Sequence, residues 1–323
     1  MIKPLQLGKQ IFPVNLIQGP LAGVSCAPFR LLTWRYSKPA YTCTEMISCK
    51  TILHSSDLIK KRYITKYADE GPVCFQLSGS EVSELAAASQ LVTSYGANLI
   101  DLNCGCPAGK IRRKGAGSKH LSNASHLYQL IRAMKQNTHV PVSIKIRVDG
   151  YSTENFNHEL IHAIQDAGTD FVVVHGRHWT EKYNVPCHYD QIQYFVNELS
   201  IPVIGNGDIA NDETLLTMMK LGCNGAMVGR ASVGQPWLIG QLIATSQHLE
   251  FSIPSLSDTG KIFLEHVAML IELLDNEKHA LLQARKIAKY YARSIKYRNE
   301  FCESVNHCFT FENLQEICCH YFN

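Results

Sequence analysis

One stretch decides the fold: Asn98-Leu99-Ile100-Asp101-Leu102-Asn103-Cys104-Gly105-Cys106-Pro107. Its apolar first half is typical of a β-strand, and the glycine and proline at its end break a strand and turn the chain outward. A cysteine therefore lies on a loop at the carboxyl end of a strand. In parallel α/β folds, ligands bind and chemistry takes place at that edge of the sheet.

Seven other segments have the same strand-like character, and the eight recur about 24–45 residues apart with helical patterns between them. This alternation predicts a (β/α)8 TIM barrel, and 323 residues suffice for such a barrel and a small appendage. A doubly wound sheet is the alternative, but no glycine fingerprint follows the first strand. The seven segments are Asn15–Gln18, Ala40–Glu45, Val73–Leu77, Val142–Arg147, Phe171–Arg177, Ile201–Ile204 and Gly225–Val228.

The composition, with 46% hydrophobic and 18% charged residues, is that of a globular protein, and the net charge of +3 names no partner by itself. The first residues lack the apolar run and cleavage site of a leader, and no stretch is long enough to span a membrane, so we expect a cytoplasmic protein. Twelve scattered cysteines without a CxxC pair indicate reduced thiols. The cysteines and histidines after residue 300 match no zinc spacing, so we expect no metal.

The character of the chain changes near residue 246. Residues 246–258 are rich in serine and proline, and strand signals then give way to helical periodicity. We therefore divide the chain into a barrel domain, 1–245, and a helical domain, 246–323. Residues 278–298 contain seven Lys or Arg and no acid, interleaved with tyrosines, a pattern that fits nucleic-acid binding as well as it fits an ordinary solvated face. The cations that we assign to RNA contact there are Arg285, Lys286, Lys289 and Arg293.

Polar side chains gather at the predicted strand exits. A large, flat, phosphorylated cofactor would use them together, with amides and a cation around a ring system and backbone N–H groups with an arginine on a phosphate. Lys145 alternates with two isoleucines, so its side chain faces the barrel interior, where an unpaired ammonium is costly unless it has a function. The set comprises Gln76, Asn103, Cys106, Lys145 and His175, with the glycine-rich exits at 205–208 and 229–230.

A basic loop follows the cysteine stretch. It carries Lys110, Arg112, Arg113 and Lys114 without an acid nearby and is followed by Gly115-Ala116-Gly117. The cations indicate phosphate contact, and the alternative is a solvated loop.

The order of the motifs resembles that of the tRNA-dihydrouridine synthases, most closely the bacterial B type. The resemblance extends along the whole predicted barrel and into Ala284-Arg285-Lys286 of the tail. It rests on Pro20-Leu21-Ala22-Gly23-Val24, Phe75-Gln76-Leu77-Ser78-Gly79, Asp101 to Pro107, Lys114 to Gly117, Lys145-Ile146-Arg147, Val174-His175-Gly176-Arg177, Ile204 to Asp208 and Val228-Gly229-Arg230.

The resemblance implies an FMN enzyme that uses NADPH, or NADH, to reduce the C5–C6 double bond of a uridine in the tRNA D-loop. It implies that flavin delivers hydride to C6, that Cys106 gives a proton to C5 and that Asn103 holds the flavin or the base. A thiol of ordinary pKa, about 8.5, is mostly protonated at neutral pH and suits an acid. The implied flavin-binding residues are Pro20, Leu21, Ala22, Gln76, Lys145, His175, Asn206, Gly207, Asp208, Gly229 and Arg230, and Arg177 joins the RNA-contacting cations.

Two features leave alternatives open at the site. Cys104 is a rival thiol two residues from Cys106, and we prefer Cys106 because Gly105 and Pro107 shape its loop. The first loop also departs from the family pattern, since Cys26 stands where an aspartate is usual, which puts the support of that loop in question.

Three other functions compete with this interpretation. A flavin barrel acting on a free pyrimidine would share the phosphate site but would not need an acid-free basic helix. An aldolase-like lyase could use Lys145 as a Schiff-base residue, and would be colourless. A non-catalytic RNA-binding factor would tolerate the loss of Cys106. The oligomeric state is open, with a monomer as the default.

Overall fold

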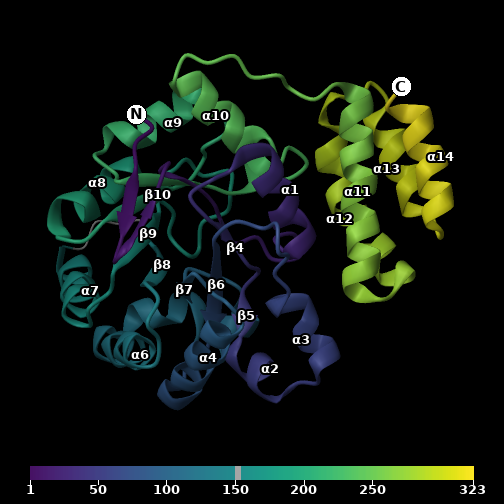
Figure 1. Cartoon of the computed structure of the whole chain (residues 1–323). Coiled ribbons are helices and arrows are strands. Elements are labelled where there is room, and N and C mark those ends of the chain that lie inside the picture. Colours follow the sequence, from purple (N-terminus) through teal and green to yellow (C-terminus); the bar gives the residue numbers. More distant parts are fainter. Residues whose placement is uncertain (150–153) are drawn as a thin grey trace.

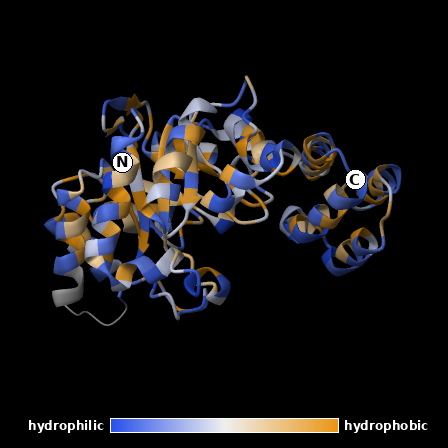
Figure 2. Ribbon diagram, turned by 90° about the horizontal axis from the view of Figure 1, so that it is seen from below, coloured by the Kyte–Doolittle hydropathy of each residue, from blue (hydrophilic) through white to orange (hydrophobic). Residues whose placement is uncertain are grey.

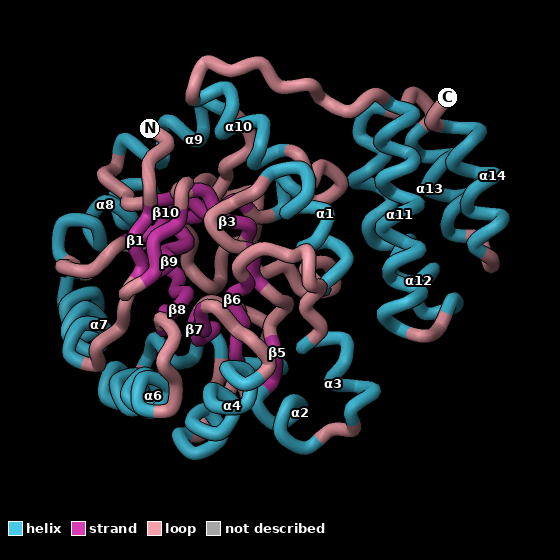
Figure 3. Tube along the Cα trace, viewed as in Figure 1, coloured by secondary structure: helices cyan, strands magenta, loops and turns pink. Residues whose placement is uncertain are grey.

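The computed structural model describes residues 1–149 and 154–323. Within them, one parallel sheet closes on itself as a barrel, with its strands at the centre of a ring of helices (Figures 1 and 3). This confirms the predicted (β/α)8 barrel. The strands are buried along almost their whole length, as expected where helices cover a parallel sheet. In sheet order they are β4 (Thr42–Cys43), β3 (Leu16–Gln18), β11 (Gly225–Val228), β10 (Val203–Asn206), β9 (Phe171–His175), β8 (Val142–Arg147), β7 (Leu99–Cys104), β6 (Val73–Ser78) and β5 (Ile47–Ser48).

The second barrel position differs from the single strand expected at 40–45. It is split into β4 and β5, and both pair with β6. Glu45 lies between the two pieces, where the backbone leaves the ladder. On the other side, β4 meets β3 through one register pair, Gln18 with Thr42. The barrel therefore closes through a short, interrupted seam.

The helices that surround the sheet bury their apolar stripes against it. Leu127, Leu130, Ile131 and Met134 of one such helix are buried at the spacing of a single helical face. The outer ring comprises α1 (Ala27–Ser37), α2 (Cys49–His54), α3 (Asp57–Ile64), α4 (Val82–Ser94), α6 (Ala124–Gln136), α7 (Glu154–Asp166), α8 (Tyr189–Glu198), α9 (Asp212–Lys220) and α10 (Leu238–Ser246).

An antiparallel hairpin that the sequence did not predict precedes the barrel. It consists of β1 (Leu5–Leu7) and β2 (Gln10–Phe12). Leu5, Leu7 and Phe12 are buried in one cluster with residues that begin the barrel strands. The hairpin therefore closes the amino-terminal end of the barrel and leaves the carboxyl end open.

Four helices at the carboxyl terminus stand beside the barrel and pack on one another (Figures 1 and 2). Phe263, Tyr291 and Phe301 form the aromatic centre of their core. The ring of Phe29 on α1 lies 6.0 Å from that of His266, which brings the helices against the barrel. They are α11 (Leu256–Leu274), α12 (Glu277–Tyr291), α13 (Arg298–Asn306) and α14 (Phe311–Tyr321).

Candidate functional site: the mouth of the barrel

The cysteine loop leaves β7 in a turn held by hydrogen bonds. Asn103 Oδ1 accepts the backbone N–H groups of Gly105 at 3.3 Å and Cys106 at 2.9 Å. The Cys106 carbonyl accepts from the Ser118 backbone N–H at 3.0 Å. Gly117 has φ +63°, and a Cβ on it would lie 2.7 Å from the Cys106 carbonyl oxygen, so the close approach requires glycine. Both ends of the turn are therefore fixed.

The two rival thiols have different surroundings. Cys104 is fully buried, and burial raises its pKa well above the ordinary value, with the charge of Asp101 as a smaller cause. Cys106 is half-buried and lines a cavity at the barrel mouth. The geometry therefore supports Cys106 as the thiol that can meet a ligand.

A chain of hydrogen bonds runs inside the barrel below this turn. Asn103 Nδ2 donates to Gln76 Oε1 at 2.8 Å, and Gln76 Nε2 donates to Asp101 Oδ2 at 2.8 Å. Ser143 Oγ donates to Asp101 Oδ1 at 2.7 Å. An amide can make four hydrogen bonds, so Gln76 still has one N–H and one lone pair for a ligand, and Asn103 still has one N–H.

Lys145 and His175 face the same cavity from β8 and β9. Lys145 Nζ donates to Asn206 Oδ1 at 2.7 Å, and burial, aided by the charge of Arg147, lowers the Lys145 pKa to about 8. Burial and then the charge of Lys145 lower the His175 pKa well below its ordinary value. The imidazole is therefore neutral at pH 7, next to an ammonium that can give up its proton readily.

The loops that follow β10 and β11 bring glycines and an arginine to the mouth of the barrel. Gly207 has φ +138° and Asp208 has φ +53°, so the chain turns sharply after β10. A Cβ on Gly229 would meet nothing within 4 Å, which leaves its backbone open to a ligand. The Arg230 guanidinium is half-exposed and lies 3.6 Å from the centre of the Tyr183 ring. These are the last two barrel exits, where phosphate sites commonly form.

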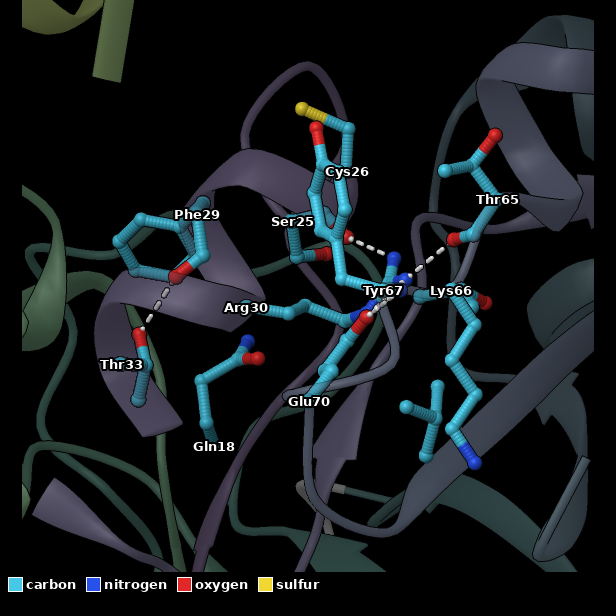
Figure 4. Close-up of polar contacts among 12 residues, drawn as sticks. Gln18, Ser25, Cys26, Phe29, Arg30, Thr33, Thr65, Lys66, Tyr67 and Glu70 are labelled. Carbon is cyan, nitrogen blue, oxygen red and sulfur yellow. Dashed lines mark hydrogen bonds and ion pairs between the residues drawn. The ribbon is translucent and has the colours of Figure 1, made fainter. Parts of the chain in front are cut away.

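The first loop, after β3, is braced from below by a buried ion pair (Figure 4). Arg30 donates from Nε to Glu70 Oε1 at 2.5 Å and from Nη1 to the Ser25 carbonyl at 3.1 Å. The Ser25 hydroxyl in turn accepts from the Leu21 N–H at 2.9 Å. Cys26 is the N-cap residue of α1 and makes no side-chain capping bond. The loop therefore depends on the ion pair and on Ser25 rather than on a capping side chain at residue 26.

A second carboxylate, at the seam of the barrel, holds the same loop. Glu45 accepts the N–H of Gly23, and Arg62 donates to Glu45 through Nε at 3.0 Å and Nη2 at 2.9 Å. Burial, and then the charge of Glu45, raise the Cys26 pKa to about 12. Cys26 is therefore an uncharged packing residue between two ion pairs.

These segments enclose one cavity of about 710 Å³, the size of a cofactor site. Every residue that the sequence assigned to catalysis or flavin binding lines it. Other lining residues were not predicted. Arg147 could have been found, since it alternates with Lys145, but Tyr183 and Tyr290 leave no local signal because they come from a long loop and from α12. The lining residues not predicted include Met46, Arg147, Tyr183, Ile209, Met227, Val233 and Tyr290.

The predicted RNA-contacting cations divide into exposed and engaged groups. Lys110, Arg113 and Lys114 are exposed around α5 (Gly109–Arg112), and Lys286, Lys289 and Arg293 are exposed on α12 and just after it. Arg293 belongs to both groups, because it lines the cavity and donates to the Ala231 carbonyl at 2.9 Å. The half-buried cations have protein partners: Arg112 lies 3.4 Å from the centre of the Trp179 ring, and Arg285 donates to the Cys308 carbonyl at 3.0 Å.

Arg177 does not lie where an RNA phosphate could reach it, which corrects the expectation for this residue. Its side chain is 1% exposed and donates to Asp208 Oδ2 at 2.6 Å and to the Val185 carbonyl at 2.7 Å. The alternation of side chains along β9 does not predict this position, because the chain bends directly after His175. Arg177 therefore braces the loop over the mouth.

In the described ranges, no set of three or more His, Cys, Asp or Glu side chains is placed to hold a metal ion. No helix among the described residues is both long and apolar enough to cross a membrane.

The mouth fits a flat phosphorylated ligand such as a flavin. Amides of Gln76 and Asn103 and the ammonium of Lys145 can meet a polar ring edge, apolar Met46 and Met227 can cover a ring face, and the glycine exits and Arg230 suit a phosphate. Among solved structures, the fold is similar to that of a mutant of morphinone reductase in complex with tetrahydroNAD. The TM-score is 0.55 at 13% identity, covering 79% of this chain and 93% of the other. The likeness shows the fold: a (β/α)8 barrel, here with a polar cavity at the carboxyl-terminal end of its strands.

Sequence comparison identifies the family to which the chain belongs. The model of the family described as dihydrouridine synthase matches residues 17–322, so the chain belongs to that family. It is thus a flavin-dependent oxidoreductase that takes its electrons from a nicotinamide.

Curated relatives extend over most of the chain. The "tRNA-dihydrouridine synthase B" of Pseudomonas putida is 34% identical over 82% of this chain and 79% of its own length. The protein of the same name from Pseudomonas aeruginosa is 32% identical over 94% and 91%. The "Probable tRNA-dihydrouridine synthase 1" of a Synechocystis species is 32% identical over 91% and 82%.

Proposed function

We propose that this protein is a tRNA-dihydrouridine synthase that uses FMN and NADPH to reduce the C5–C6 double bond of a D-loop uridine. The observation that carries the proposal is the half-buried Cys106 thiol at the edge of a cavity lined by every predicted flavin-binding residue. Membership of the family and the names of the relatives support the tRNA substrate.

FMN would be held by the first loop, by Gln76 and Lys145, and by the exits of β10 and β11. When bound, the flavin supplies the hydride that the uracil receives at C6. Arg230 and the backbone around Gly229 would bind the phosphate. The first loop, fixed through Ser25 and Gly23, would exclude water from the ligand.

Cys106 would donate its proton to C5 of the uracil. A thiol can act as a general acid without an activating base. The backbone of Cys106 is held by Asn103 Oδ1, so the thiol is supported by a side chain that itself lines the cavity. His175, neutral at pH 7, adds no charge to the cavity that the thiol lines.

The RNA would be held by the exposed cations near the mouth. They come from both parts of the chain: the loop that contains α5 follows the thiol, while α12 brings Tyr290 to the cavity and Arg293 follows it. The target base must leave its stack to reach a barrel interior, and phosphate contacts beside the mouth can offset part of that cost. We therefore assign RNA binding to the helical domain, residues 246–323, together with this loop.

The test is a spectrum of the purified protein followed by two half-reactions. We expect a yellow protein whose flavin is bleached by NADPH without oxygen and is reoxidised by unmodified tRNA. Cys106→Ala should retain bleaching and lose reoxidation by tRNA. Cys302→Ala, which alters another half-buried thiol, on α13, is the matched control and should behave as the parent protein.

Other outcomes would support the alternative functions. Reoxidation by free uridine as fast as by tRNA would indicate a pyrimidine reductase. A colourless protein that takes up no FMN would overturn the flavin assignment, and unchanged turnover in Cys106→Ala would overturn the role of the thiol.

A further inference from the structure

Asp101 lies at the buried end of the hydrogen-bond chain that leads to Cys106. It is 4% exposed and stands two residues before Asn103 on the same strand. Register explains the arrangement: Gln76, Asp101 and Ser143 are direct partners across β6, β7 and β8, so their side chains form one layer inside the barrel. Asn103 belongs to the next layer toward the mouth, because alternate residues of a strand share a face.

The chain has a direction. An ionised carboxylate only accepts hydrogen bonds, so Asp101 requires the nitrogen of the Gln76 amide. The Gln76 oxygen then faces Asn103 and requires its nitrogen, which leaves the Asn103 oxygen for the turn. The turn presents two N–H groups, from Gly105 and Cys106, which only donate. The acceptor at one end and the donors at the other therefore require the same orientation of both amides.

We propose that Asp101 is a positioning residue for Cys106. From below the cavity, its carboxylate sets the orientation of the Gln76 and Asn103 amides, and through them it holds the Cys106 backbone at the mouth. The value of this for catalysis rests on the proposed function, because it is there that Cys106 is the acid. The positioning itself is a property of the folded chain and can be measured without turnover.

The test uses isosteric substitutions that exchange amide and carboxylate groups between positions 76 and 101 of the hydrogen-bond chain. Gln76→Glu places two carboxylates face to face, and such a pair retains one proton with a strongly raised pKa. The chain of hydrogen bonds can then form only while that proton is present. As the pH rises, the proton is lost, the two charges repel each other, and Asn103 loses its acceptor.

The double variant Asp101→Asn with Gln76→Glu restores every hydrogen bond without an added proton. The new amide nitrogen at position 101 donates to the new carboxylate at position 76, and the amide oxygen accepts from Ser143. The same carboxylate still accepts from Asn103. Both variants carry this carboxylate at position 76, so any effect of its charge on the flavin is common to them. The two variants differ only at position 101, where the residue that faces this carboxylate is an aspartate in the single variant and an asparagine in the double variant.

Two properties are measured on the purified full-length variants and on the parent protein. The first is the thermal midpoint, which should fall by about 5 °C between about pH 6 and about pH 8.5 in Gln76→Glu and not in the double variant. The second is alkylation of Cys106 by N-ethylmaleimide, measured by peptide mass spectrometry with the exposed Cys319 as internal reference. At the higher pH it should be about fivefold faster in Gln76→Glu and return to the parent rate in the double variant.

Each contrary result overturns the proposal. If the second substitution fails to remove the pH dependence, Asp101 does not direct the Gln76 amide. If the midpoint behaves as expected while the Cys106 rate never changes, the chain exists but does not hold the thiol. Bleaching of the flavin by NADPH tests the proposed function separately, so a failure of one is distinguishable from a failure of the other.

Discussion

Lys145 of β8 and Asn206 of β10 are connected across the intervening β9 by a hydrogen bond of 2.7 Å between Nζ and Oδ1. The Asn206 amide nitrogen in turn donates to the Met227 carbonyl at 2.8 Å, which fixes its oxygen toward the lysine. The ammonium is thus oriented before any ligand arrives. Burial lowers its pKa to about 8, so its charge is held only weakly in the free protein.

This predicts that FMN affinity depends on pH. Binding of an electron-rich ring and a phosphate favours the charged ammonium, so affinity should be highest below pH 8 and should fall by at most about tenfold per unit above it. FMN fluorescence quenching from about pH 7 to about pH 9.5 measures this. Lys145→Met should bind more weakly and without the pH dependence, whereas an equally steep curve in that variant would exclude Lys145 as its source.

The buried pair of Arg30 and Glu70 should be required for stability. Glu70→Gln leaves the Arg30 charge buried without a counter-ion, and we expect a loss of about 3–5 kcal/mol in the free energy of unfolding, measured in urea. The exposed pair of Arg35 and Glu265 provides the control, since Glu265→Gln should cost less than about 1 kcal/mol. Equal losses in the two variants would contradict the role assigned to the buried pair.

The raised pKa of Asp101 predicts that the stability of the parent protein falls as the pH rises through a defined window. Burial raises its pKa from 3.8 to about 6, so ionisation costs the folded state free energy as the pH rises through that window. The Asp101→Asn variant has no carboxyl at this position and does not pay this cost of ionisation. The stability of the variant minus that of the parent should therefore increase by up to about 3 kcal/mol between about pH 4 and about pH 6.5, and stay level above it. A constant difference in urea unfolding across this range would show that folding does not raise the pKa of Asp101.

The exposed cations on α12 should contact phosphates without reading sequence. Replacing both Lys286 and Lys289 by alanine should weaken tRNA binding and reduce the salt dependence of the affinity by about one unit of slope for each phosphate that is no longer neutralised. Lys9→Ala is the control, because Lys9 is exposed on the hairpin at the closed end of the barrel. Filter binding over a salt series measures both, and an equal effect of Lys9→Ala would show non-specific attraction.

The barrel was predictable because its strands carry their own signal. Buried parallel strands are continuous apolar runs, and the polar residues that follow them must meet at one edge once the sheet closes. The hairpin of β1 and β2 was missed because each strand has three residues, too few for a periodic pattern. The break at Glu45 was missed because the reason for it, a contact with Gly23 and Arg62, lies outside the strand.

The site could be predicted only where the strands carry it. Lys145 was identified because a charged residue between two isoleucines is unusual in a buried strand. Tyr183 and Tyr290 reach the cavity from distant segments, and contacts of that kind leave no trace in local spacing. Arg177 was assigned to RNA contact from the resemblance, whereas the bend after β9 turns it toward Asp208.

The interrupted seam gives the barrel one compliant side. Between β3 and β4 the ladder has a single register pair, whereas β7 and β8 share five. Amide hydrogens near the seam should therefore exchange with deuterium earlier than those of β7 and β8. The compliant side adjoins the first loop, whereas Asn103, which holds the Cys106 backbone, lies on β7 on the stiff side. Local opening therefore disturbs the wall that carries Cys106 less than it disturbs the seam.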